Sequence, residues 1–128
     1  MNKFGLENVV TEKANVELTD LDNGVKVNFS GDIDIQNPEP IFVPFFEQIH
    51  NNIIENGIKY VELDFSNLTF LNSSGIKTLI KWITKVTPLP ADKKYNFKVI
   101  ANSQITWQET SLKMLSMLAP GLIEIQIQ

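Results

Sequence analysis

The sequence predicts an α/β domain: a mixed β-sheet of about five strands with helices packed mainly on one face. Residues 25–30 alternate apolar and polar side chains, as a half-buried strand does, and Asp22, Asn23 and Gly24 just before them favour a hairpin turn. From residue 58 onward, strand-like and helix-like segments alternate along the chain. This alternation favours right-handed crossovers between largely parallel strands.

The start of the sheet is predicted to be a hairpin. A strand around Val16 and Leu18 precedes the strand at residues 25–30. We expect residues 15–128 to form a single domain, and residues 1–14 to be either a leader or an extra edge strand.

An amphipathic helix is predicted after residue 40, because apolar side chains recur at helical spacing and Gly57 follows their end. Pro44 leaves the first regular turn of this helix open, since a proline inside a helix removes a hydrogen bond. His50 is predicted to be an exposed position of this helix. The side chains predicted to face the core are Phe42, Phe45, Phe46, Ile49 and Ile53.

The second half of the chain is predicted to contribute three strands and two helices. Met114 and Met117 are predicted to pack in the core. The segments, in order, are a buried strand at residues 58–65, a helix at 73–86, a strand at 95–101, a helix at about 107–118 and a closing strand at 122–128.

Composition argues against several classes of function. The chain has no cysteine and one histidine, which argues against metal sites and redox chemistry, so we expect no cofactor. A net charge of −4 with scattered lysines disfavours binding to nucleic acid. No apolar stretch approaches the length of a membrane span, and the charged N-terminus does not resemble a signal peptide. These features predict a cytoplasmic protein.

The short loop between the central strand and the next helix is the candidate functional segment. It ends in Asn72, Ser73, Ser74 and Gly75 at the predicted helix start, where serine and asparagine cap free backbone N–H groups. The same position tolerates a phosphate, because the helix dipole favours negative charge there. The alternative is a purely structural role, in which both serines serve only as cap and first-turn residues.

This segment resembles the signature of bacterial anti-sigma-factor antagonists of the STAS domain family, in which an apolar strand leads through Asp-Ser-Ser-Gly or Asp-Ser-Thr-Gly into a helix. Residues 27–34 look like the family's second strand, which ends in Gly-Glu-Leu-Asp. The order of strands and helices also agrees from about residue 15 to the end. Two motifs at the right separation make this resemblance more specific than either motif alone.

The resemblance implies a partner switch with no catalytic activity of its own. A serine kinase of the histidine-kinase-like ATPase fold would phosphorylate Ser73, or alternatively Ser74, and a PP2C-type phosphatase would reverse the modification. The unmodified form would bind the kinase or a downstream regulator, and the phosphorylated form would release it. Residues assigned to the interface or to its electrostatics are Asn72, Gly75, Asp34, Asp32, Lys77 and Trp82.

Asn72 departs from the family motif, which has aspartate at this position. Asparagine still caps a helix, but it carries no charge with which to orient a hydroxyl. This departure favours an alternative function, a STAS scaffold or subunit of a larger assembly that is never phosphorylated. A hydrolase that uses Ser73 is disfavoured, because the Gly-x-Ser-x-Gly elbow is missing and His50 is the only histidine base.

The sequence allows two roles each for the aspartates of the second strand and for Trp82. Asp32 and Asp34 fit a solvated strand end that influences the serine loop, with an active-site carboxylate pair as the alternative. Trp82 either packs in the core or anchors a partner.

Overall fold

The N-terminal hairpin forms where the alternating pattern predicts it. Residues 2–128, which the computed structural model describes, form six strands and three helices. Strands β2 (Ala14–Leu21) and β3 (Gly24–Ile33) pair antiparallel. The short strand β1 (Val9–Val10) pairs antiparallel with β2, so the N-terminal segment supplies an extra edge strand.

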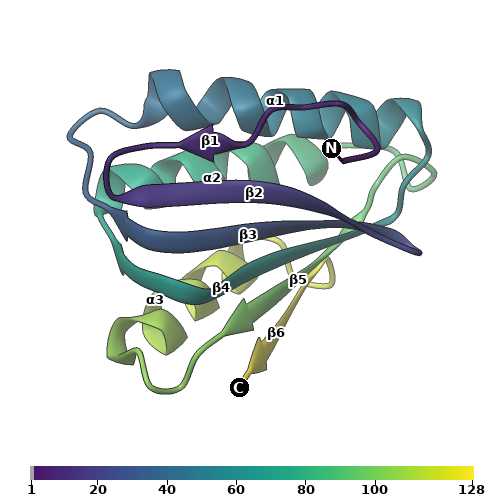
Figure 1. Cartoon of the computed structure of the whole chain (residues 1–128). Helices are drawn as coiled ribbons and strands as arrows, with labels where there is room; N and C mark the ends of the chain where they lie inside the picture. Colours follow the sequence, from purple (N-terminus) through teal and green to yellow (C-terminus); the bar gives the residue numbers. More distant parts are fainter. Residues whose placement is uncertain (1) are drawn as a thin grey trace.

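The remaining strands run parallel to β3 and are joined by helical crossovers. Helix α1 (Glu39–Glu55) leads to β4 (Tyr60–Leu71), α2 (Ser73–Val86) to β5 (Asn96–Ala101), and α3 (Thr106–Leu118) to β6 (Ile123–Ile127). The order across the sheet is β1-β2-β3-β4-β5-β6, with β1 and β6 at opposite edges (Figure 1). The predicted mixed α/β fold is therefore confirmed, with six strands in place of about five.

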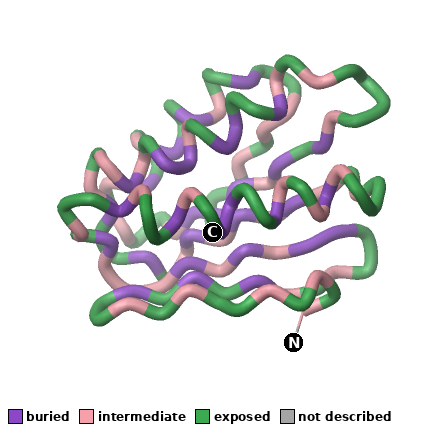
Figure 2. The backbone as a smooth tube through the Cα atoms, turned by 90° about the horizontal axis from the view of Figure 1, so that it is seen from above, coloured by how far each residue is buried: buried purple, intermediate pink, exposed green. Residues whose placement is uncertain are grey.

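The helices cover one face of the sheet and leave the other to solvent. In β2, the side chains of Ala14, Val16 and Leu18 are buried, whereas the alternate residues Asn15 and Glu17 are exposed. Figure 2 shows buried segments alternating with more exposed ones along the chain. Right-handed crossovers in a strand order that never reverses place all helices on the same side. The sheet is thus a two-layer structure with one polar face.

Aromatic rings fill the layer between the helices and the sheet. The rings of Phe29 and Phe65 stack with centroids 4.5 Å apart, and those of Phe46 and Trp82 lie 5.0 Å apart. The predicted core stripe of α1 is confirmed, because all five of its apolar residues are buried. Pro44 lies inside α1, which nevertheless starts at Glu39.

Trp82 is a core residue, and the partner-anchor alternative for it is wrong. Its side chain is only 2% exposed, and its indole Nε1 donates a hydrogen bond to the Tyr95 hydroxyl over 2.7 Å. The predicted exposure of His50 is also wrong: this ring is half buried, with Nδ1 2.6 Å from the same hydroxyl. The pattern of α1 missed this contact because Tyr95 comes from a loop far along the chain.

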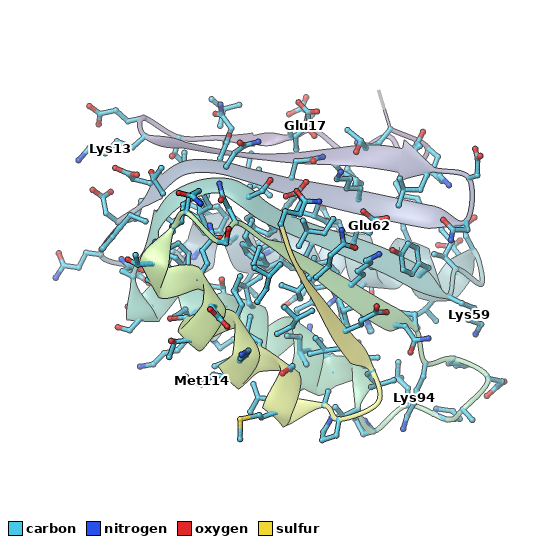
Figure 3. All side chains as sticks on the ribbon, turned by 90° about the horizontal axis from the view of Figure 1, so that it is seen from below. Lys13, Glu17, Lys59, Glu62, Lys94 and Met114 are labelled. Carbon is cyan, nitrogen blue, oxygen red and sulfur yellow. The ribbon has the colours of Figure 1, made fainter. Side chains whose placement is uncertain are left out.

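Helix α3 buries a narrower stripe than the sequence predicts. Its buried residues are Gln108, Leu112 and Leu115. Met114, labelled in Figure 3, and Met117 are 54% and 76% exposed, so the prediction that they pack in the core is wrong. Both residues lie on a side of α3 that the sheet does not cover.

Candidate functional site

The candidate site lies at the edge of the sheet where the parallel strands β3 and β4 end. The last paired residues of these strands are Ile33 and Leu71. The short loop predicted between the central strand and its helix is wrong, because pairing with β3 extends β4 to Leu71 and only Asn72 separates it from α2. The backbone N–H of Asn72 donates a hydrogen bond to the Ile33 carbonyl over 3.0 Å. The start of α2, which carries Ser73 and Ser74, is thereby fixed to the end of β3.

Asn72 uses both ends of its side-chain amide. Its Oδ1 accepts a hydrogen bond from the Gly75 backbone N–H at 2.7 Å, which caps α2. Its Nδ2 donates to the Ile35 carbonyl at 2.9 Å, in the loop between β3 and α1. A donor on one side and an acceptor on the other fix the orientation of the amide. Aspartate could make the first of these hydrogen bonds but not the second.

Gly75 allows α2 to start close against the strand ends. A Cβ atom at this position would lie 2.6 Å from Leu71 Cδ1 and 3.1 Å from Ile33 Cγ2. The first distance is shorter than real Cβ contacts, so a larger residue would require the Leu71 side chain or the start of the helix to shift. The glycine of the motif therefore has a packing role here.

Ser73 and Ser74 occupy the first turn of α2, after the cap. Ser73 is exposed and Ser74 is partly exposed. Because the cap is formed by Asn72, neither serine side chain is needed to close the helix end. The Ser73 hydroxyl is accessible to another protein.

The two aspartates lie close to the start of α2, and each has a partner of its own. Asp34 lies between Ile33 and Ile35, which both accept hydrogen bonds from Asn72. The Asp34 carboxylate pairs with Lys13 Nζ at 2.9 Å on the surface. The hydrogen bond and charge of Asp34 raise the pKa of the Lys13 ammonium.

Asp32 is engaged by a neighbour on β4. Its carboxylate accepts a hydrogen bond from the Thr69 hydroxyl, which also contacts the Gly31 carbonyl. The two aspartates therefore have separate partners, which favours the predicted solvated strand end over a catalytic carboxylate pair. In Figure 3, Lys13 marks the end of the sheet at which this cluster lies.

Helix α3 supports the end of β4 through Gln108, a side chain that sequence reasoning did not single out. Pairing between β4 and β5 stops at Asp64 and Ile100, so carbonyls further along β4 that face this side have no partner on β5. The buried Gln108 Nε2 donates to the Phe65 and Leu68 carbonyls at 2.6 and 2.8 Å. A single glutamine in an amphipathic helix gives no sequence signal for this role.

Trp107 and Phe70 extend the site toward α3. The Trp107 Nε1 donates to the Thr69 carbonyl at 2.7 Å, and the Phe70 ring next in the chain is 46% exposed. Lys77, one turn into α2, is also exposed. Of the residues assigned to the interface from the sequence, Trp82 lies in the core and Gly75 is buried against the strand ends, whereas the others are at least partly exposed.

The described residues give no sign of a metal centre or of a membrane span. Within residues 2–128 no three histidine, cysteine or acidic side chains gather as metal ligands would. No helix in the same part of the chain is both long and apolar enough to cross a bilayer.

The fold and the site define a class of small α/β domains that present a serine loop where the central parallel strand meets its helix. The chain belongs to the STAS domain family, whose sequence profile matches residues 14–88, more than half of the chain. This confirms the resemblance drawn from the two motifs.

A solved structure supports the same fold. The chain is similar to the crystal structure of an anti-sigma factor antagonist from Mycobacterium paratuberculosis, with a TM-score of 0.57 and 24% sequence identity. The match covers 87% of this chain and 86% of the other. A search of curated proteins gave no significant match.

Proposed function

We propose that this chain is a phosphorylation-controlled protein-binding switch of the anti-sigma-factor-antagonist type, with Ser73 as the phosphoacceptor. The observation that carries the proposal is the position of Ser73: its side chain is exposed in the first turn of α2 and is not required for the cap. A kinase can therefore modify it without disturbing the helix end. Ser74, which is less exposed, is the alternative acceptor.

The arrangement of the sheet favours a protein partner over a small ligand. In open α/β sheets, ligands bind where the strand order reverses and two loops diverge to form a crevice. Here each strand neighbours the next one in sequence, so the order never reverses. The carboxyl edge instead presents Ser73, Lys77 and the half-exposed Phe70 as an accessible surface.

A phosphate on Ser73 would change this surface electrostatically. It adds a charge of about −2 close to a loop that already carries Asp34, and it leaves the fold in place because the start of a helix tolerates an anion. Inside a packed interface the same phosphate is desolvated and repelled by any acidic neighbour. Each 1.4 kcal/mol lost weakens the complex about tenfold.

The partners we propose follow from the family resemblance. A serine kinase of the histidine-kinase-like ATPase fold binds the unmodified chain and phosphorylates it, and a PP2C-type phosphatase restores it. A downstream regulator is the second binding target. The chain itself carries no catalytic group in this scheme.

One observation favours a second candidate, a STAS subunit that binds permanently and is never modified. Asn72 stands where the family motif has aspartate, and both ends of its amide hold α2 and the β3–α1 loop together. The position is then structural and offers no carboxylate to orient the Ser73 hydroxyl.

The first experiment is mass spectrometry of the protein isolated from its native cells under several growth conditions. The proposal predicts one phosphate, on the peptide that contains Ser73. A protein that is unmodified in every condition contradicts the switch and supports the permanent subunit.

Binding measurements with variants test the switch directly. Ser73→Ala should bind the kinase-like partner constitutively, and Ser73→Glu should bind it at least about tenfold more weakly. Ser74→Ala is the matched control, one residue away in the same turn, and should behave like the wild type. Equal binding by Ser73→Ala and Ser73→Glu contradicts the proposal.

A further inference from the structure

The edge of the sheet formed by β6 is open and has little protection against pairing. Within residues 2–128, β5 is the only strand that pairs with β6, and the register between them runs without a bulge from Ile123 to Ile127. Edge strands are usually blocked by proline, lysine or a bulge. β6 contains no proline, lysine or bulge, and Glu124 is its one charged residue.

The backbone of β6 directs every second residue outward. The Leu122 carbonyl accepts from the Phe97 N–H at 2.7 Å, and the Gln128 N–H donates to the Ala101 carbonyl at 2.8 Å. Even-numbered residues thus bond to β5, and the alternation of a strand turns the N–H and C=O groups of Ile123, Ile125 and Ile127 toward the free edge. These groups form a row of donors and acceptors without a strand partner among the described residues.

We propose that this edge binds a second copy of the chain, with the two β6 strands antiparallel about a two-fold axis at Ile125. The proposal is independent of the function of Ser73. In this register Ile125 faces its own copy and Ile123 faces Ile127, all of them outward-directed residues, so about six backbone hydrogen bonds form.

The side chains fit the same register. Glu124 of one copy lies opposite Gln126 of the other, so a carboxylate meets an amide and no charge faces a like charge. An axis one residue earlier would place Glu124 against itself. The isoleucines lie on the helix-covered face, since they pair with the buried residues of β5, and Ile127, which is 40% exposed, would be covered by the pairing.

The helices leave room for this arrangement. Helix α3 contacts both β5 and β6, and its first turn bonds to β4, so it lies over the sheet on the inner side of the free edge. The opposite edge is a poorer partner, because β1 is two residues long and pairing of unlike edges generates an open filament. A self-complementary edge gives a closed dimer.

A pair of substitutions at Ile125 tests the proposal by sedimentation or light scattering at increasing protein concentration. The wild type should form a dimer at high micromolar concentration. Ile125→Pro removes the outward N–H and no bond to β5, so it should weaken the dimer about thirtyfold or more, since two intermolecular hydrogen bonds are lost. Ile125→Ala loses similar side-chain bulk but keeps the N–H, and should still form a dimer.

Disulfide cross-linking tests the register even if Ile125→Pro folds poorly. The chain has no native cysteine, so single variants give a clean readout. A mixture of Glu124→Cys and Gln126→Cys proteins should cross-link rapidly, because these positions face each other in a non-hydrogen-bonded pair. Each variant alone should cross-link slowly. A wild type that stays monomeric, a dimer that survives Ile125→Pro, or equal cross-linking by Glu124→Cys alone would overturn the proposal.

Discussion

Replacing Asn72 by aspartate restores the family motif, and we expect this change to destabilise the protein. The carboxylate of Asn72→Asp can still accept the hydrogen bond from Gly75. It has no N–H to donate to the Ile35 carbonyl, which Nδ2 now contacts at 2.9 Å. Two oxygen acceptors would then face each other at the junction of α2 and the β3–α1 loop.

The expected loss combines two opposing effects. Leaving a carbonyl without its donor costs about 1–3 kcal/mol, and the lower half of this range applies because the contact is only partly buried. A negative charge at the start of α2 stabilises the helix by about 0.3–1 kcal/mol. The net destabilisation is therefore about 1 kcal/mol, which lowers the melting temperature by roughly 3–5 °C for a domain of this size.

Urea unfolding followed by the fluorescence of the buried Trp82 measures this difference. Asn72→Ser keeps a cap but not the donor, and Asn72→Ala loses both, so the alanine variant should be the least stable of the three. An aspartate variant that is as stable as the wild type would refute the reasoning, because the amide contact with Ile35 would then contribute nothing.

Three further variants test other contacts. Gly75→Ala should destabilise the domain by about 1–3 kcal/mol in urea unfolding, although alanine favours a helix, because its Cβ meets the buried Leu71 side chain. An unchanged midpoint would show that Leu71 or the helix start shifts at no cost. Burial, and then the charge of Lys85, lowers the pKa of His50 below its ordinary 6.5, so the unfolded chain binds the extra proton. The His50 contribution to stability is then present above pH 6.5 and is lost as the pH falls below 6.5. Thermal melts of His50→Gln should therefore show a weaker pH dependence below pH 6.5 than those of the wild type. Burial acts to raise the pKa of Asp64, but hydrogen bonds from Ser66 and the nearby Lys26 outweigh it and lower the pKa below 3.8. Asp64→Asn should therefore lose less stability than the wild type as the pH falls below 4, as acid unfolding can measure.

Local patterns in the sequence predict the helices and strands well, because each pattern depends only on residues that are close together in the chain. The alternation in β3 and the helical spacing in α1 depend on residues a few positions apart, and both elements form as predicted. The position of Ser73 at the first turn of α2 follows from the capping signal at Asn72 in the same way.

Contacts between distant segments carry no such local signal. His50 and Trp82 meet at the hydroxyl of Tyr95, and nothing in the helical pattern of either one predicts this shared partner. The contact of Asn72 with Ile35 likewise joins segments 37 residues apart. A pattern shows whether a side chain faces the core but not which polar group it will find there.

The consecutive order of the strands also bears on how the chain can fold. Each strand pairs with the one made just before it, so every new strand finds its neighbour already synthesised, and every loop that must close spans a single crossover. The hairpin of β2 and β3 can form first and act as a template on which β4, β5 and β6 add in turn. Assembly can therefore follow the direction of translation, without waiting for a distant segment to emerge.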